Sequence, residues 1–273
     1  MCTVIVCFDP EAQVPLLIAA IRDEMLERRW EWPDRHWPEH PGLIGGRDTR
    51  EGGTWLAAGA GEQGASPPRV GAVLNGFSPD ASSAPGRSTV PAGVPRFSRG
   101  RLPLRGAERG DLGLGPAELR HYDPFHLLVA DAGKAVLYGW NGSGRTEEEL
   151  PVGVSVLVNT GLDAAAPRAR RFGPVFDRGR PRPAAEALRS AVEPGEIWGQ
   201  WPQILNEAAR GKARAGGFGP KGGDDPSSLI AHVDLGGHVW ATSSMSLLAC
   251  TADRMRYAFT GAPGDPEAWR MVV

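Results

Sequence analysis

Short runs of apolar residues, each closed by turn-forming residues, dominate the chain. Residues 3–8 and 14–20 are two such runs, and Asp9-Pro10 between them is typical of a turn, so we expect two paired, buried strands. A hairpin is expected around Ala132-Gly133. The remaining strands are predicted at 54–60, 70–74, 127–131, 134–140, 239–250 and 254–259.

Two segments, 184–191 and 198–209, have the character of helices. Four apolar residues of the second recur at the spacing of one helix face: Trp201, Ile204, Leu205 and Ala208. Strands and helices together predict a mixed α and β fold. The chain lacks the glycine motifs of nucleotide-binding proteins, which argues against a nucleotide fold.

One segment, residues 78–116, is rich in Gly, Pro, Ser and Arg. Such a composition is typical of a long loop, so we expect a mobile surface excursion there. The chain has no internal repeat and no linker between regions of different composition. This favours a single domain over residues 1–273.

Length and charge exclude several classes of function. With 273 residues and a formal charge of -2, the chain can bury a substantial core and has no overall attraction to nucleic acid or an anionic membrane. No apolar stretch approaches about 18 residues, so no transmembrane segment is expected. The start of the chain lacks the pattern of a signal peptide. We therefore expect a cytoplasmic protein whose partner is a small molecule.

The three cysteines, Cys2, Cys7 and Cys250, are too few for a disulfide framework and lack the spacing of a zinc site. We expect neither a metal nor a cofactor. Cys2 is special because removal of Met1 would give it a free α-amino group beside its thiol. An α-amine titrates at about 7.7–8.0 and a free thiol at about 8.5, so the amine could accept the thiol proton near neutral pH. The alternative is a small apolar residue that opens the first strand.

Several motifs resemble one known family. The most specific are Arg22-Asp23-Glu24 and Glu51-Gly52-Gly53-Thr54-Trp55-Leu56. Weaker likenesses occur at 45–48, 73–77, 98–100, 125–131, 151–154, 158–159 and 241–248. Together they resemble the family named for an Asn-Arg-Asp-Glu motif, that of transport and Golgi organisation protein 2, which is similar to a branch of the N-terminal-nucleophile hydrolases. The resemblance implies an α+β fold of the four-layer αββα sandwich type, with Cys2 at the end of a central strand.

The resemblance also implies four catalytic residues. Members begin Met-Cys, so Cys2 is the implied nucleophile, and Asp23 would orient its amine. Asn75 and Asn159 stand at positions where neutral amide donors would stabilise an oxyanion. Both are also typical turn residues, and that alternative stays open.

Arg22, Trp55 and Ser243 are the implied substrate-binding residues. An Arg can hold a thiolate or a substrate carboxylate, although Arg22 and Asp23 could equally be a solvated ion pair after a strand. Because side chains alternate along a strand, we do not expect both to point into one pocket. Ile21 stands where the family has Asn, and Ser243 where many members have Arg. These departures predict a less polar site that prefers neutral acyl groups.

Two functions follow from these residues. The first is a cysteine amidohydrolase or acyltransferase of the N-terminal-nucleophile type, which attacks an amide or thioester with Cys2. The second, also implied by the resemblance, is a non-enzymatic protein that binds and carries haem, lipid or acyl-thioester ligands in the same pocket. A carrier does not need an activated thiol at Cys2, and this difference separates the two hypotheses.

Overall fold

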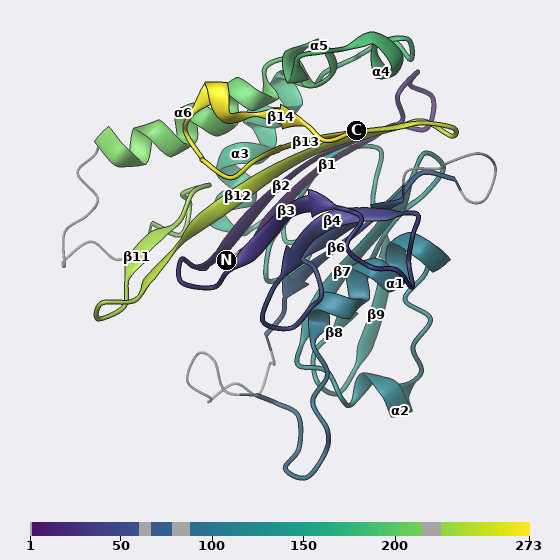
Figure 1. The fold of residues 1–273 in the computed structure, drawn as a ribbon, viewed down its shortest axis with the longest axis vertical. Coiled ribbons are helices and arrows are strands. Elements are labelled where there is room, and N and C mark those ends of the chain that lie inside the picture. Colours follow the sequence, from purple (N-terminus) through teal and green to yellow (C-terminus); the bar gives the residue numbers. More distant parts are fainter. Residues whose placement is uncertain (1, 60–66, 78–87, 215–224) are drawn as a thin grey trace.

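The computed structural model describes residues 2–59, 67–77, 88–214 and 225–273 (Figure 1). Within these ranges the chain forms two antiparallel sheets and a few helices. The fold is therefore mixed α and β, as the apolar runs predict.

The first sheet has the strand order β10-β1-β2-β12-β13-β14, with β11 paired to β12. Its strands are β1 (Thr3–Phe8), β2 (Leu16–Met25), β10 (Gly153–Leu157), β11 (His232–Asp234), β12 (Val239–Cys250), β13 (Met255–Thr260) and β14 (Arg270–Met271). The predicted strands 3–8 and 239–250 are confirmed at both ends, and β1 pairs with β2 as expected. β2 runs beyond the predicted 14–20, because its charged end pairs with β12 as far as Met25.

The second sheet follows the order of the chain from β3 to β9. Its strands are β3 (Trp30–Asp34), β4 (Leu43–Asp48), β5 (Leu56–Gly59), β6 (Arg69–Asn75), β7 (Phe125–Asp131), β8 (Ala135–Trp140) and β9 (Arg145–Glu149). β7 and β8 form the predicted hairpin. Pro33 lies in the edge strand β3, and the opposite edge strand β9 is charged and exposed throughout. Both features discourage pairing with another chain.

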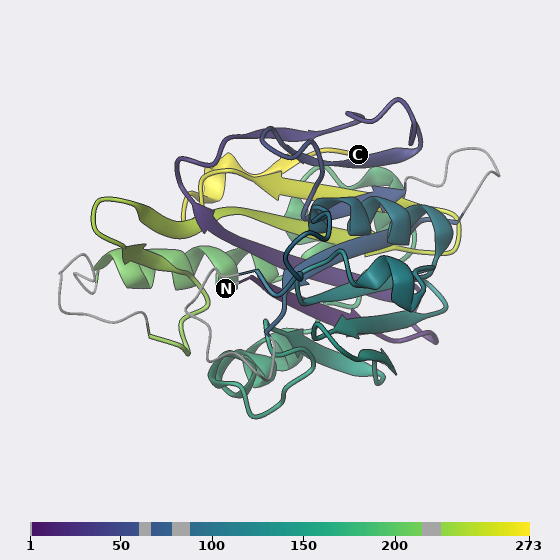
Figure 2. The same cartoon turned by 90° about the horizontal axis from the view of Figure 1, so that it is seen from below.

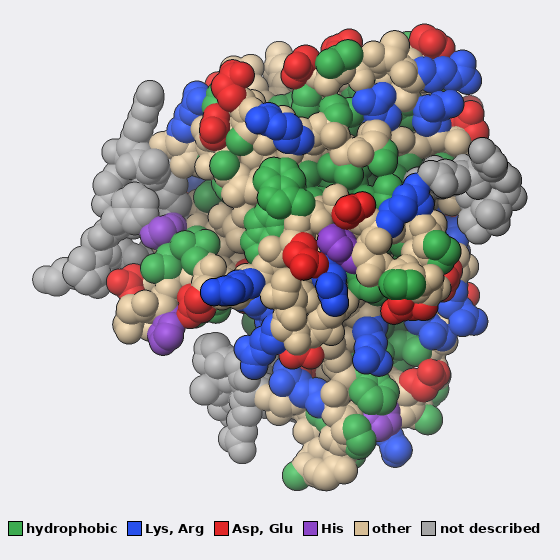
Figure 3. All heavy atoms as spheres, viewed as in Figure 1, with side chains coloured by type: hydrophobic (Ala, Val, Ile, Leu, Met, Phe, Trp, Pro, Cys, Tyr) green, Lys and Arg blue, Asp and Glu red, His purple; other side chains and the backbone are tan. Residues whose placement is uncertain are grey.

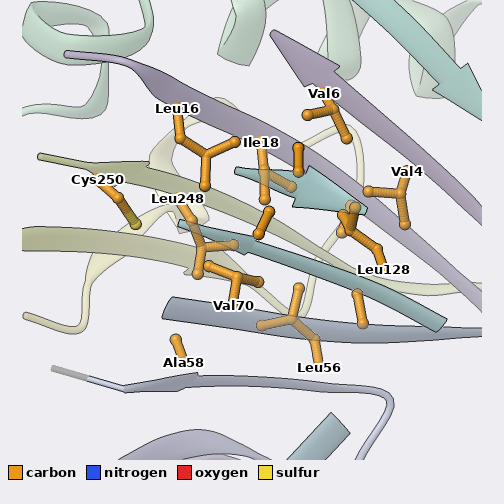
Figure 4. Packing of buried hydrophobic residues seen from close by; sticks show 14 of the residues in the cluster. Val4, Val6, Leu16, Ile18, Leu56, Ala58, Val70, Leu128, Leu248 and Cys250 are labelled. Carbon is orange, nitrogen blue, oxygen red and sulfur yellow. The ribbon is translucent and has the colours of Figure 1, made fainter. Parts of the chain in front are cut away.

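The two sheets face each other across the main hydrophobic core (Figure 4). Side chains alternate along β2, so that Leu16 and Ile18 point into this core while Leu17 and Ala19 point to the other face of the sheet. That second face is also buried. Burial on both sides explains why β1 and β2 are apolar at consecutive positions.

Helices cover the outer face of each sheet (Figures 1 and 2). On the first sheet lie α3 (Pro167–Arg178), α4 (Ala187–Ser190), α5 (Pro194–Trp198) and α6 (Trp201–Arg214). On the second lie α1 (Leu102–Arg109) and α2 (Pro116–Leu119). The described residues also form two short helices, η2 (Arg99–Arg101) and η3 (Pro266–Ala268). The predicted helix 198–209 corresponds to α6, which begins at Trp201. Trp198 is the last residue of α5, and Gly199, with a positive φ of 54°, separates the two helices.

The segment 78–116, predicted as a surface excursion, contains a helix that packs on the second sheet. Residues 78–87 lie outside the described ranges, but α1 packs on the second sheet with Leu102, Leu104 and Ala107 buried. A side chain at Gly71 would overlap the Pro103 carbonyl, so this helix rests directly on β6. The high content of Gly and Arg in this segment led to the prediction of a loop, although the apolar residues of α1 form one buried helix face.

Candidate functional site

A cavity of about 460 Å³ opens between the sheets at the end where β1 begins. The first sheet contributes Cys2 and residues 22–24 to its wall, and the second contributes Val73 and Asn75. Parts of the segments 48–55 and 96–100 close it. On the face drawn in Figure 3, Lys and Arg side chains gather below the position that the N-terminus has in Figure 1.

Cys2 is half-buried at the start of β1 and packs against the core between the sheets. Its Sγ donates a weak hydrogen bond to the Asp23 carbonyl over 3.8 Å. Burial raises the pKa of the Cys2 thiol, and the negative charge of Asp23 raises it further. The thiol is therefore protonated at neutral pH and needs a base before it can act as a nucleophile.

Arg22 and Asp23 both line the cavity, but their side chains point to opposite faces of β2, as strand alternation predicts. The Arg22 guanidinium lies 4.3 Å from the ring centroid of Trp55, on the side of the second sheet. The Asp23 carboxylate lies 3.2 Å from Arg168 of α3, on the helix side. Continuing the β1–β2 register by one residue beyond Thr3 and Ile21 places Cys2 beside Arg22.

Ser243 contacts Arg22 rather than the cavity. It lies at a bulge in β12, where the register shifts between Thr242 and Ser244. Its Oγ accepts a 2.8 Å hydrogen bond from Arg22 Nη1 and donates one to the Arg22 carbonyl over 3.3 Å. Ser243 is absent from the cavity wall and contacts Arg22, which lines it.

The cavity wall is rich in charged side chains. Five arginines line it: Arg22, Arg28, Arg50, Arg96 and Arg99. Five carboxylates line it as well: Asp23, Glu24, Asp48, Glu51 and Asp123. The predicted preference for neutral acyl groups assumes that Ile21 and Ser243 leave a substrate carboxylate without a partner, and these arginines remove that assumption.

Asp23 and Arg168 form a buried ion pair behind the cavity, with side-chain exposures of 0% and 1%. Thr242 Oγ1 donates a 2.6 Å hydrogen bond to Asp23, and Arg168 also donates to Thr3 Oγ1 over 2.8 Å. Burial raises the pKa of Asp23, while Arg168 and Thr242 oppose that rise. Sequence reasoning missed Arg168 because it lies 145 residues from Asp23 and no motif marks it.

The two candidate amides are placed differently. Asn75, at the end of β6, is exposed and lines the cavity. Asn159 is buried and absent from that wall. Its Nδ2 donates a 2.6 Å hydrogen bond to the Asn75 carbonyl. Asn159 therefore holds the backbone of Asn75, which lines the cavity.

Arg99 is a cavity residue to which the sequence assigned no role, although Ser98-Arg99-Gly100 belongs to the resemblance. Its Nη1 donates to the Pro124 carbonyl over 2.8 Å. The other cations of the wall have carboxylate partners, such as Arg28 with Asp48 at 2.6 Å.

In the part of the chain that the structure describes, no three His, Cys, Asp or Glu side chains are arranged to hold a metal ion. No helix among those residues is long and apolar enough to cross a membrane.

Comparison with known proteins identifies the family. The family model described as transport and Golgi organisation 2 matches residues 1–178, a stretch that contains every candidate site residue except Ser243. A search of curated proteins finds no match. Because the matched stretch is more than half of the chain, the protein belongs to the transport and Golgi organisation 2 family.

Proposed function

We propose that the protein is a cysteine amidohydrolase or acyltransferase of the N-terminal-nucleophile type, acting on an amide or a thioester. The observation that carries the proposal is the position of Cys2. Its thiol lies at the end of a central strand, on a cavity wall shared with Arg22 and Asn75. The volume of the cavity, about 460 Å³, is large enough for a small amide or thioester substrate.

The layer order of the fold supports this proposal. Two antiparallel sheets pack face to face, and helices cover both outer faces. This is the αββα arrangement expected of an N-terminal-nucleophile hydrolase. Cys2 lies on the wall of the cavity that both sheets line, as the first residue of such an enzyme should.

The mechanism begins with removal of Met1, which frees the Cys2 amine. That amine takes the proton from Sγ, and the thiolate attacks the carbonyl carbon of the substrate. The Asn75 amide donates a hydrogen bond to the oxyanion that forms. When the C–N or C–S bond breaks, the Cys2 ammonium returns its proton to the leaving group. Water or another amine then attacks the Cys2 thioester and releases the acyl group.

Asp23 and Asn159 act through their neighbours in this mechanism. The Asp23 carbonyl accepts the weak hydrogen bond from Cys2 Sγ, and the Asp23 carboxylate is held in place by Arg168 and Thr242, which supports a role in orienting the Cys2 amine. Asn159 holds the Asn75 carbonyl and so fixes the strand end that carries the donor.

A carrier of haem, lipid or acyl-thioester ligands is the second candidate. The raised pKa of Cys2, caused first by burial, favours it, because a protonated thiol is a poor nucleophile. Trp55, with Arg22 stacked on its ring, also offers a flat surface for a ligand. A carrier would bind in the same cavity without forming an adduct on Cys2.

The first test is the state of Cys2 itself. We expect intact-mass spectrometry to show a chain that begins at Cys2, and peptide mapping to show that iodoacetamide reacts faster there than at Cys7 or Cys250. Cys2 is half-buried, whereas the other two are buried, and burial raises the pKa of Cys250 to about 12. Retention of Met1, or labelling of Cys2 no faster than of Cys7, would contradict the mechanism.

The second test concerns the oxyanion donor. Asn75→Ala should lower kcat by about 10²–10³ if its amide is a main donor, with little change in the free energy of unfolding because the side chain is exposed. Asn75→Asp is the matched variant: it keeps the shape but replaces the N–H donor with an acceptor. Full activity in both variants would return Asn75 to the role of a turn residue.

A further inference from the structure

Arg99 is held rigidly at the cavity wall. It begins the short helix η2, which Ser98 caps by accepting a 3.2 Å hydrogen bond from the Gly100 N–H. The Gly100 carbonyl accepts a 2.8 Å hydrogen bond from the Thr54 N–H. A side chain at Gly53 would lie only 2.6 Å from the Gly100 carbonyl carbon, so the two loops pack backbone against backbone. Arg99 is therefore presented from a fixed support.

The charge of Arg99 is not matched by a protein anion. Three other cations of the wall have carboxylate partners: Arg28 with Asp48 at 2.6 Å, Arg96 with Asp123 at 2.5 Å, and Arg50 with Glu51 at 3.8 Å. Within residues 2–59, 67–77, 88–214 and 225–273, no carboxylate lies within ion-pair distance of Arg99. One guanidinium nitrogen of Arg99, Nη1, donates to the Pro124 carbonyl, which leaves most of the guanidinium fork for another acceptor.

Arg99 and Arg22 both lie near the reactive sulfur. Burial lowers the pKa of each guanidinium, while a carboxylate, Asp123 for Arg99 and Glu24 for Arg22, opposes that fall. A negative charge on Cys2 would oppose it in both, so both cations lie within electrostatic reach of the thiol. Arg22 has only a distant carboxylate, Glu24 at 3.8 Å, which is also shared with Arg28. Five carboxylates also line the cavity, but neither of these two partly desolvated cations has one of them within hydrogen-bond distance.

We propose that Arg99, with Arg22 on the wall of the same cavity, binds a carboxylate of the substrate, so that the preferred substrates are amides or thioesters carrying a carboxylate within a few atoms of the scissile carbonyl. This inference rests on the proposed function and names its substrate class. The planar guanidinium fork matches a carboxylate in geometry as well as in charge. The bound carboxylate replaces the missing protein anion and holds the carbonyl near Cys2.

The test compares three anilides of similar size: the neutral N-valeryl anilide, the glutaryl anilide and N-valeryl-4-aminobenzoate. The last two carry the carboxylate on the acyl side and on the leaving side. We expect at least one acid to exceed the neutral anilide in kcat/KM, and Arg99→Gln to lower that value by about 10–100-fold while changing the neutral anilide little. Arg99→Lys should lose less, because it keeps the charge but not the fork.

The matched control is Arg50→Gln, which removes a cation from the same wall whose side chain is 77% exposed and paired with Glu51. It should not alter the preference between acid and neutral anilides. Equal losses in Arg50→Gln and Arg99→Gln, or a preference of the wild type for the neutral anilide, would overturn the inference. Circular dichroism melting of each variant checks that it is folded.

Calorimetric titration of Cys2→Ala with the same anilides separates this inference from the proposed function. A preference for an acid that disappears when Arg99→Gln is added supports the carboxylate site, even if the wild type turns over none of the three anilides. In that case the proposed reaction fails while the site stands. Equal binding of acid and neutral anilides overturns the site, whatever the turnover.

Discussion

Cys2→Ala should lower turnover of any amide or thioester substrate by at least about 10⁴-fold, because no other group in the proposed mechanism can form the acyl-enzyme. Binding of the same substrate should change by no more than a few-fold, since the thiol contributes little contact area. The measurement is single-turnover kinetics together with intact-mass detection of an acyl adduct on the wild type. We expect the adduct on the peptide that begins at Cys2 and none on the variant.

Cys7→Ala is the matched control. Cys7 lies on the same strand but is buried toward the helices, so its loss should leave turnover unchanged apart from a small loss of stability. Turnover that survives Cys2→Ala would exclude the nucleophile. Tight binding in the wild type and in Cys2→Ala, without an adduct or product in either, would make the carrier the better account of the cavity.

Two strands, β1 and β12, have the first and last residues that the sequence predicts, and both are buried on two faces of the sheet. β1 and β12 are apolar or small at consecutive positions, so their limits are visible in the chain. The predicted strand 14–20 stops short of the true end of β2 at Met25, because the charged residues Arg22, Asp23 and Glu24 resemble the start of a loop. They continue the strand because partners that are distant in sequence, β12 and α3, neutralise or bury them.

The sequence identified most of the candidate site residues that line the cavity. Cys2, Arg22, Asp23, Trp55 and Asn75 all line one cavity, and each belongs to a motif or to the first residues of the chain. Their roles as catalytic or substrate-binding groups remain proposals. Neither Asn159 nor Ser243 lines the cavity, because each turns its polar group to a neighbouring site residue.

The residues that were missed are arginines whose meaning depends on pairing. Arg168 and Arg99 cannot be told from surface arginines by spacing. One becomes a buried counter-ion only when α3 packs on the first sheet, and the other becomes an unmatched cation only when its loop is fixed against Gly53. Ion pairs between residues distant in sequence form only in the folded chain, so a local sequence pattern does not predict them.

Arg168→Met should lower the free energy of unfolding at pH 7.5 by about 3–5 kcal/mol, the cost of leaving one member of a buried ion pair without its partner. Arg168 is 1% exposed and Asp23 is 0% exposed, so water cannot replace the lost charge. The hydrogen bond from Arg168 to Thr3 is lost as well. The measurement is urea unfolding. Arg170→Met is the control on the same helix, and because Arg170 is exposed its effect should stay within about 0.5 kcal/mol.

The pH dependence distinguishes an unpaired charge from a simple loss of packing. Burial already raises the pKa of Asp23, and removal of Arg168 takes away a charge that lowers it, so the pKa in the folded variant rises further. The folded variant then holds its proton at a pH where the unfolded chain, with an ordinary carboxyl pKa of about 3.9, has lost it. Its stability must therefore increase as the pH falls toward about 4, and the deficit relative to wild type must narrow. When Asp23→Asn is added to both wild type and Arg168→Met, the difference in unfolding free energy between them should no longer narrow as the pH falls. The prediction would be wrong if the loss of unfolding free energy in Arg168→Met did not change with pH, or if it equalled the loss in Arg170→Met. Either result would show that the charge of Arg168 does not stabilise the Asp23 carboxylate.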